Sequence, residues 1–346
     1  MQNLRKLGLL LALASSALAQ PPAHDPISLE LDTSEADAVL AILNANAANQ
    51  AVTAEAWQRV FASVPYQRLK KREASMRREF SDDDFKHFVL SPELAGKRDA
   101  LAQTLERWKR ADLRSAASRI LPYLPADARI RASVYPVIKP QSNSFVFETD
   151  TDPASFLYVD PEKSRASFEN TVAHEMHHIG LASAAKAYGK IADAVPEPQS
   201  SVLNWITAFG EGLAVLAAAG SADIDPLASE PEVDRVRWDQ DMKFWTHEFN
   251  DVNQFFLDIL HGGFKDKDII AHVGYHFFGY RGAWYQVGYK MAVVVERKYG
   301  RPALLEGMTD PRKLLLRYNQ AAAEINSTGP AEKLPLWSDE VIAALK

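Results

Sequence analysis

Apolar residues recur at three- and four-residue intervals through most of the first third of the chain, over residues 33–123. Clear examples are the segments TSEADAVLAILNANA and TAEAWQRVFASV. This spacing places the apolar side chains on one face of an α-helix. Ser81 precedes Asp84 by three residues, and Ser91 is followed directly by Pro92; both patterns are typical of helix starts. The pattern therefore predicts a series of helices.

The pattern changes in the next part of the chain, where β-branched and aromatic residues dominate the segments IRASVYPVI, SFVFET and SFLYVD. Such residues favour extended strands. The turn-rich sequence KPQSNS separates the first two segments, which predicts that they pair as a hairpin with the third strand close by. Pro136 lies inside the first strand and has no amide hydrogen, so it indicates an edge position or a bulge.

Helical patterns return after the strands. Asp160, Pro161 and Glu162 supply a cap, a first-turn proline and a favourable negative charge, which predicts a helix start at this point. Helices dominate again toward the end of the chain. We therefore predict an α+β, mainly α-helical protein. Residues 20–125 would form an N-terminal helical region, and residues 126–346 a second domain with a small β-sheet.

The start of the chain has the composition of an export signal. MQNLRK carries two positive charges, LGLLLALA is a short apolar run, and an A-L-A site precedes Gln20. This order predicts a secretory signal peptide, residues 1–19, and a periplasmic or secreted product. The alternative is a membrane anchor, which needs a longer apolar run. No later run approaches the roughly 20 residues of a spanning helix, so we expect no stable membrane insertion after cleavage.

Charge and cysteine content narrow the function classes. The formal net charge is −6 and becomes −8 when Arg5 and Lys6 are removed with the leader. An acidic protein is a poor candidate for binding nucleic acid, and we expect no such partner. The chain has no cysteine, which excludes disulfides and thiolate metal sites. Any zinc ion would therefore be bound by histidine, aspartate or glutamate.

The segment TVAHEMHHIG, residues 171–180, contains three histidines and a glutamate. His174 and His178 are four residues apart, so on a helix they share one face, where one zinc ion can take a nitrogen from each. In this H-E-x-x-H pattern Glu175 acts as a general base on water. Chance predicts roughly 0.016 matches in such a chain; the alternative is a histidine-rich surface patch. His177 points away from the shared face, which favours a supporting or solvent-exposed role.

A catalytic zinc site usually has three protein ligands and one open position. Glu211, in NWITAFGEGLAVLAAAG, is the next carboxylate in an apolar setting. Burial of an unpaired charge there would be costly, and metal binding would offset that cost. The alternative is an exposed glutamate at a helix bend. Gly210, Gly212 and Ala214 are expected to let this helix approach the histidine-bearing helix closely.

An H-E-x-x-H motif followed by a glutamate in a downstream helix resembles the glutamate-zincin group of zinc metallopeptidases. The segments HEMHH, FGEGLA and GAWYQVGYKM are similar to bacterial families of zinc-dependent peptidases with unknown substrates. The resemblance spans roughly residues 126–300. It implies a zincin-like catalytic domain in which His174, His178 and Glu211 bind zinc, with Glu175 as the general base.

One position departs from that family pattern. In the best-known members an aspartate four residues after the ligand glutamate supports the first histidine, whereas this chain has Val215 there. Asp223, Asp225 or a backbone carbonyl would then have to provide the support.

The segment HVGYHFFGYRGAWYQVGYKM is dense in tyrosine, histidine and glycine. Zinc peptidases need a hydrogen-bond donor beside the tetrahedral oxyanion, commonly tyrosine or histidine. Tyr285 is the first candidate, because the glycine and alanine just upstream place it at the start of a helix. His276 and Tyr280 follow. The alternative is that these aromatic residues belong to the core.

Together these patterns predict a zinc-dependent metallopeptidase that hydrolyses a peptide or protein substrate with a metal-activated water. An exposed edge strand from IRASVYPVI or SFVFE is expected to bind the substrate in extended form. Two alternatives stay open. One is a zinc amidase that acts on another amide, such as a cell-wall peptide. The other is a non-catalytic exported helical protein that binds metal.

Overall fold

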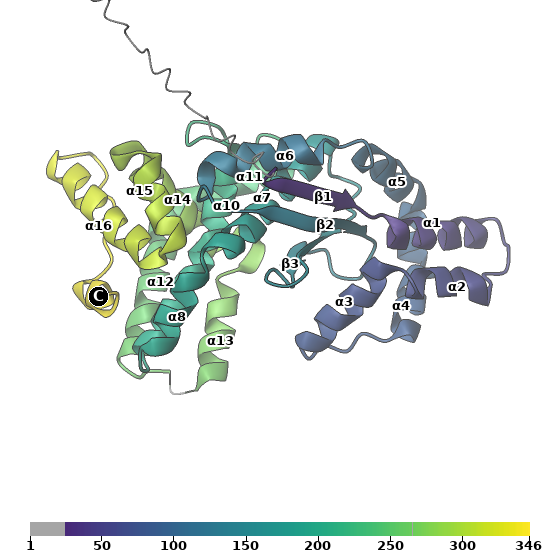
Figure 1. Ribbon diagram of the computed structural model, residues 1–346, viewed down its shortest axis with the longest axis horizontal. Coiled ribbons are helices and arrows are strands. Elements are labelled where there is room, and N and C mark those ends of the chain that lie inside the picture. Colours follow the sequence, from purple (N-terminus) through teal and green to yellow (C-terminus); the bar gives the residue numbers. More distant parts are fainter. Residues whose placement is uncertain (1–24, 265) are drawn as a thin grey trace, which may run out of the picture.

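The protein is described from a computed structural model, which covers residues 25–264 and 266–346. The predicted signal peptide, residues 1–19, lies outside the described residues. A four-stranded sheet occupies the middle of the molecule, with N-terminal helices at one end and C-terminal helices at the other (Figure 1). The predicted α+β, mainly helical class is confirmed.

The N-terminal part of the chain forms successive helices, as predicted. Their bounds are α1 Ser34–Ala47, α2 Ala54–Phe61, α3 Val64–Ser75, α4 Asp82–Val89, α5 Pro92–Trp108, α6 Leu113–Ile120 and the 3₁₀ turn η1 Leu121–Tyr123. Both predicted helix starts are confirmed. The Ser81 side chain accepts a hydrogen bond from the Asp84 amide at 3.0 Å, and the Ser91 side chain accepts one from the Leu94 amide at 3.2 Å.

The sheet has the strand order β1-β2-β4-β3. The strands are β1 Ile27–Leu31, β2 Ile130–Val137, β3 Phe145–Phe147 and β4 Ala154–Tyr158. β1, β2 and β4 are parallel neighbours, and β3 runs antiparallel to β4. The predicted hairpin between the first two segments is wrong, because β4 lies between β2 and β3. Burial explains the order, since β4 is mostly buried and takes an interior place, whereas β3 is only partly buried and takes the edge.

Pro136 lies in an interior strand, so its predicted edge or bulge position is wrong. It pairs with Leu157 of β4, but it lies beyond Val134, the last β2 residue opposite β1. The missing amide hydrogen therefore faces the side on which β1 has already ended. Two residues later, on that same side, the Ile138 amide donates instead to the buried carboxylate of Glu35 at 3.0 Å. The proline interrupts no ladder hydrogen bond.

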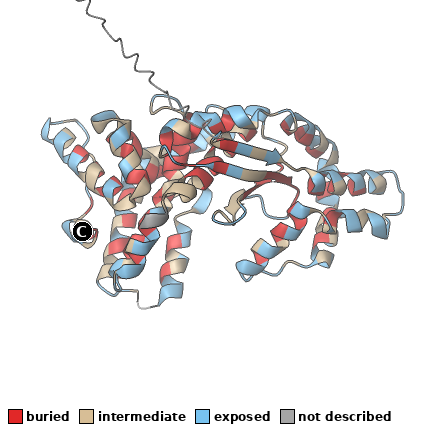
Figure 2. Ribbon diagram, viewed as in Figure 1, coloured by how far each residue is buried: buried red, intermediate tan, exposed pale blue. Residues whose placement is uncertain are grey.

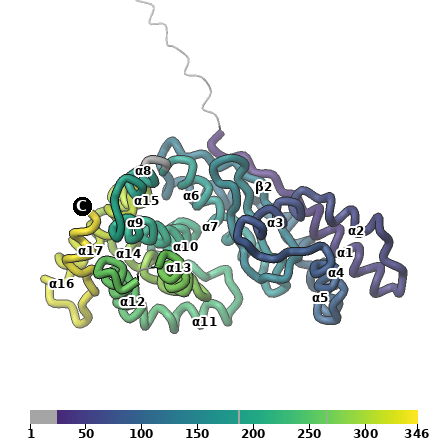
Figure 3. Tube along the Cα trace, turned by 90° about the horizontal axis from the view of Figure 1, so that it is seen from below, coloured from purple at the N-terminus to yellow at the C-terminus, as the bar shows by residue number. Residues whose placement is uncertain are grey.

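Helices make up most of the rest of the chain. Their bounds are α7 Arg165–Ala184, α8 Lys186–Ala194, α9 Gln199–Trp205, η2 Ile206–Phe209, α10 Gly210–Ala219, α11 Glu232–Asp241, η3 Met242–Phe244, α12 Trp245–Leu260, α13 Lys267–His276, η4 Gly279–Arg281, α14 Ala283–Tyr299, α15 Arg301–Thr309, α16 Pro311–Ser327 and α17 Asp339–Ala344. α10 contacts both α7 and α14 (Figure 3). This three-helix arrangement positions the residues considered below.

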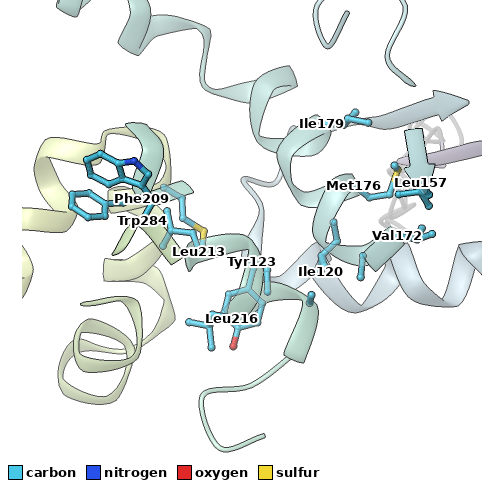
Figure 4. Close-up of a cluster of buried hydrophobic side chains, with 14 of the residues drawn as sticks. Ile120, Tyr123, Leu157, Val172, Met176, Ile179, Phe209, Leu213, Leu216 and Trp284 are labelled. Atoms are coloured by element: carbon cyan, nitrogen blue, oxygen red, sulfur yellow. The ribbon is translucent and has the colours of Figure 1, made fainter. Parts of the chain in front are cut away.

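The buried residues run through the middle of the molecule and into both helical ends (Figure 2). The central core joins η1, α7, β4, α10 and α14 (Figure 4). Trp108 of α5 stacks on Phe168 of α7 with ring centroids 4.3 Å apart, which ties the N-terminal helices to the same core. The predicted boundary between residues 125 and 126 falls just before β2, and β1 from the N-terminal side pairs with that strand.

One helical stretch, Gln199–Ala219, is long and apolar enough to cross a membrane by length and composition. The expectation that no later run approaches the length of a spanning helix is therefore wrong for this stretch. In the folded protein 67% of its most apolar window is buried. Packing of α9, η2 and α10 into the core accounts for this apolar composition.

Candidate metal centre

Helix α7 contains both motif histidines and begins after Ser164, whose side chain accepts a hydrogen bond from the Ser167 amide at 3.0 Å. The predicted start at Asp160 is wrong. The Asp160 carboxylate accepts from the Glu162 amide at 3.0 Å and forms a turn that precedes the helix. α7 packs against β2, β3 and β4, so the predicted small sheet beside this helix is confirmed.

The side chains of His174, His178 and Glu211 converge. The two histidine Nε2 atoms lie 3.1 Å apart. The Glu211 Oε2 atom lies 3.1 Å from the Nε2 atom of His174 and 3.4 Å from that of His178. Glu211 stands in the first turn of α10, so the packing of α10 against α7 brings it to the histidines.

This geometry fits a single zinc ion. Zinc bonds to nitrogen and oxygen ligands are about 2.0–2.1 Å long, and a tetrahedral arrangement then separates neighbouring ligand atoms by about 3.3 Å. The three separations between the Nε2 and Oε2 atoms, 3.1, 3.1 and 3.4 Å, are close to that edge length. Two imidazoles and one carboxylate are also a usual ligand set for a catalytic zinc ion. The three residues could therefore hold zinc and leave one position open.

The protonation of this cluster couples metal binding to pH. Burial acts to raise the pKa of Glu211, but the charge of His178 and hydrogen bonds from both histidines outweigh it and hold this pKa below its usual range. Burial acts to lower the pKa of His178, but the Glu211 carboxylate outweighs it and raises this pKa to about 9. A metal ion must displace the proton on His178, so metal affinity should rise with pH.

Glu175 follows His174 in α7 and is almost completely buried, with 7% of its surface exposed. It lines a cavity together with His174. Burial raises the pKa of Glu175, and the neighbouring histidines partly oppose this rise. A carboxylate with a raised pKa beside a candidate metal ligand is suited to accept a proton from water.

The cavity has a volume of about 350 Å³. Its walls come from the loop before β3, the end of β4, one face of α7, α10 and the loop after it, and the segment that leads into α14. The lining residues are Ser142, Asn143, Ser144, Tyr158, Asp160, Lys163, Asn170, Thr171, His174, Glu175, Val215, Ala218, Pro226, Leu227, Glu230, Tyr280, Arg281 and Tyr285. The His174 side of the candidate metal centre therefore opens into a space with the size of a small-ligand site.

Tyr285 lies in the first turn of α14 and lines the same cavity. Its ring is nearly parallel to that of His174, with ring centroids 6.2 Å apart and an interplanar angle of 14°. Burial raises the pKa of Tyr285, and the negative charges of Glu211 and Glu175 raise it further. The phenol therefore keeps its proton and can donate a hydrogen bond within the cavity.

Two glycines determine how α10 and α14 cross. A Cβ atom on Gly212 would lie 2.1 Å from the Tyr289 amide nitrogen, and one on Gly288 would lie 2.7 Å from the Phe209 carbonyl oxygen. Backbone therefore packs directly on backbone. Gly212 was expected to let α10 approach the histidine-bearing helix, but its close contact is with α14. This contact brings Glu211 and the N-terminal turn of α14 to the same place.

Replacement of Gly212 by alanine is expected to lower the free energy of unfolding by about 3 kcal/mol, because the added methyl group meets backbone that cannot rotate away. Urea unfolding of the metal-free protein measures this effect. Gly210→Ala is the matched control, since a Cβ at Gly210 meets nothing within 4 Å. Equal destabilisation by Gly212→Ala and Gly210→Ala would show that the close contact of Gly212 with α14 is not the cause of the effect.

Some candidates from the sequence do not reach the cavity. His276 ends α13, is exposed and is absent from the cavity lining among the described residues. Asp223 pairs with Arg297 at 2.9 Å, and Asp225 accepts from the Leu227 amide at 2.9 Å. Within the described parts of the structure, neither aspartate accepts a hydrogen bond from the motif histidines. Tyr280 does line the cavity, although 48% of its surface is exposed.

His177 is completely buried, which excludes the solvent-exposed role considered for it. Its Nε2 atom lies 3.3 Å from the Tyr123 carbonyl oxygen, on the core side of α7. Burial lowers the pKa of His177 to about 3, so this side chain is neutral. It helps to anchor α7 to η1.

The sequence analysis missed three charged residues in the cavity wall, Lys163, Glu230 and Arg281. The Glu230 carboxylate is buried and accepts a hydrogen bond from the Ser167 hydroxyl at 2.8 Å. Arg281 stands in the tyrosine- and glycine-rich segment whose aromatic residues were the candidate oxyanion donors. No periodic pattern connects three residues so far apart in the chain.

The comparisons with known proteins agree with this geometry at the level of the family. The model of the family described as "Putative zinc dependent peptidase (DUF5700)" matches residues 57–327, which is most of the chain. No curated protein and no solved structure matches. The matched region contains His174, His178 and Glu211 together with the cavity beside them. The chain therefore belongs to this family, whose description names a zinc-dependent peptidase.

Proposed function

We propose that the protein is a zinc metallopeptidase of the glutamate-zincin type, in which His174, His178 and Glu211 bind the metal. The observation that carries this proposal is the convergence of their three ligand atoms, at separations that suit one tetrahedral ion, beside a cavity lined by Glu175. The family match supports the general role in zinc-dependent peptide hydrolysis. The leader-like residues 1–19 add the proposal that the enzyme works outside the cytoplasm.

In the proposed mechanism, His174, His178 and Glu211 would hold a zinc ion, which would supply Lewis-acid activation of the scissile carbonyl and of the attacking water. Glu175 takes a proton from that water and passes it to the leaving amine. The Tyr285 hydroxyl donates a hydrogen bond to the oxyanion that forms on the former carbonyl oxygen. Val215 and Leu227 give the cavity an apolar wall, which strengthens these polar contacts by excluding water.

We propose that an extended substrate runs along β3. Of the two strands considered from the sequence, β2 is paired on both sides, whereas β3 is an edge strand that pairs only with β4 among the residues that the structure describes. The loop that leads into β3, Ser142–Ser144, lines the cavity. An edge strand can bind an extended peptide through backbone hydrogen bonds.

Metal removal tests the proposed function. A chelator is expected to abolish cleavage of a peptide mixture, such as a tryptic digest of serum albumin, and one equivalent of zinc is expected to restore it. Mass spectrometry of the digest identifies new termini, and elemental analysis gives the zinc content per chain. Cleavage that persists in protein shown to be free of metal would refute the proposal.

Replacement of Tyr285 by phenylalanine is expected to lower kcat about 100-fold, with zinc content and KM nearly unchanged, because one oxyanion donor is lost. The ring and its packing remain. Steady-state kinetics on the peptide that the wild-type protein cleaves best measure the effect. Tyr289→Phe is the matched control, because Tyr289 stands one turn later in α14, packs against Trp238 and does not line the cavity. An unchanged kcat in Tyr285→Phe would assign the donor elsewhere.

A further inference from the structure

Two cations face one carboxylate in the wall of the cavity that His174 and Glu175 also line. Glu230 Oε2 lies 3.4 Å from the Lys163 Nζ atom and 3.8 Å from the Arg281 Nη2 atom. The same oxygen accepts a hydrogen bond from the Ser167 hydroxyl at 2.8 Å. The Glu230 side chain is only 1% exposed, so its surroundings hold the carboxylate in position beside the two cations.

This cluster carries one more positive charge than negative charge. The Arg281 Nη1 atom is buried and has no hydrogen-bond partner in the part of the chain that the structure describes. The 3.8 Å separation from Glu230 is too long for a hydrogen bond. A guanidinium group has five N–H donors, and a buried donor left without an acceptor requires an explanation.

The backbone also holds Arg281 in place. Its φ angle is +50°, in the left-handed region that residues other than glycine rarely adopt. Its carbonyl oxygen accepts a hydrogen bond from the buried Gln286 side chain at 3.0 Å. The turn thus directs the Arg281 side chain to the cavity wall, four residues before the proposed oxyanion donor Tyr285.

We propose that Arg281 and Lys163 bind a carboxylate of the substrate, so that the enzyme selects peptides with a negative charge near the scissile bond. A planar carboxylate matches the fork of a guanidinium group, and the net positive charge of the cluster favours such an anion. Asp160 also lines the cavity, and its Oδ1 atom accepts a hydrogen bond from the Glu162 amide at 3.0 Å. This inference rests on the proposed function, because it assigns the substrate class of that same site.

Two kinds of peptide carboxylate have this chemistry, the free C-terminus and an aspartate or glutamate side chain. Four probe peptides separate them: N-acetyl-tetra-alanine as the free acid and as the C-terminal amide, and the amide with its third residue changed to glutamate or to glutamine. Calorimetric titration into the zinc-loaded Glu175→Gln protein gives the dissociation constants without turnover.

At least one carboxylate peptide is expected to bind about tenfold or more tightly than its neutral partner, because it pairs with a charged donor. Arg281→Gln is expected to reduce that ratio to about one, and Lys163→Gln to reduce it in part. Arg165→Gln is the control, since Arg165 is exposed on α7 and pairs with Glu169 away from the cavity. Circular dichroism and zinc content show whether each variant is folded and loaded.

Two results would overturn the inference. The first is that the carboxylate and neutral peptides have nearly equal dissociation constants in the Glu175→Gln protein. The second is that the preference for the carboxylate peptide is unchanged by Arg281→Gln and also by Lys163→Gln. The second result would show that the carboxylate binds the zinc ion or another group instead. Failure of the proposed function is a different observation. In that case the wild-type protein cleaves none of these peptides nor the albumin digest, even if Arg281 controls carboxylate binding.

Discussion

Replacement of Glu175 by glutamine is expected to leave the zinc content unchanged and to lower kcat by about 10²- to 10⁴-fold. Glutamine has nearly the same shape but cannot accept a proton at neutral pH, and general-base catalysis contributes a factor of about this size. Glu175 is not one of the three clustered ligand residues, so the metal should stay bound. Elemental analysis and steady-state hydrolysis of the best cleaved peptide, performed on the same preparation, measure both quantities.

The buried environment helps to separate this effect from misfolding. Burial raises the pKa of Glu175, which means that the folded protein penalises the charged form of this side chain more than water does. A neutral glutamine should therefore not destabilise the fold. Glu162→Gln is the control, because Glu162 is exposed in the turn before α7. Full turnover in the Glu175→Gln protein would show that another group takes the proton.

Replacement of Glu211 by alanine is expected to weaken zinc binding by more than about 100-fold and to abolish turnover at stoichiometric zinc. Loss of a residue that only hydrogen-bonds to a ligand already costs about 10- to 100-fold in metal affinity. Here the change removes one of the three converging ligand atoms and leaves two histidines from one helix. A competition titration with a chromophoric zinc chelator measures the dissociation constant.

The matched control for this prediction is Asp223→Ala. Asp223 was considered from the sequence as support for the histidines, but it is an exposed residue paired with Arg297. Its removal is expected to leave zinc affinity unchanged. Equal zinc affinity in the Glu211→Ala and wild-type proteins would remove Glu211 from the metal centre and would leave only the two histidines as candidates.

Local patterns predicted the N-terminal helices and the starts of α4 and α5, although the predicted start at Asp160 was wrong. Ser81 and Ser91 cap α4 and α5 as expected, because a cap depends only on residues within one helical turn. Strand pairing was predicted less well. The turn-rich KPQSNS segment indicated a hairpin, yet β4 pairs with β2 because both strands are apolar enough to be buried in the sheet interior. Burial against distant elements decided this order.

In the proposed site, too, local patterns predicted some residues, whereas contacts between distant elements decided the others. The four-residue spacing of His174 and His178 already requires that both imidazoles lie on one face of α7, because helix geometry relates residues one turn apart. The adjacent glutamate comes with the same motif. The spacing does not say which distant carboxylate or phenol faces them. For Glu211 the apolar composition of its segment was the signal, since a lone charge there needed a partner.

By itself, then, the sequence determined the helical character of the chain, the two imidazoles on one helical face and the glutamate beside them. Only the tertiary structure brought Glu211, Tyr285 and Arg281 to that face. The physical reason is packing between distant helices: α10 packs against α7, and Gly212 lets the backbone of α14 touch α10 without side chains between them. Such a contact joins segments more than seventy residues apart, and helical periodicity relates only residues within a few turns of one another.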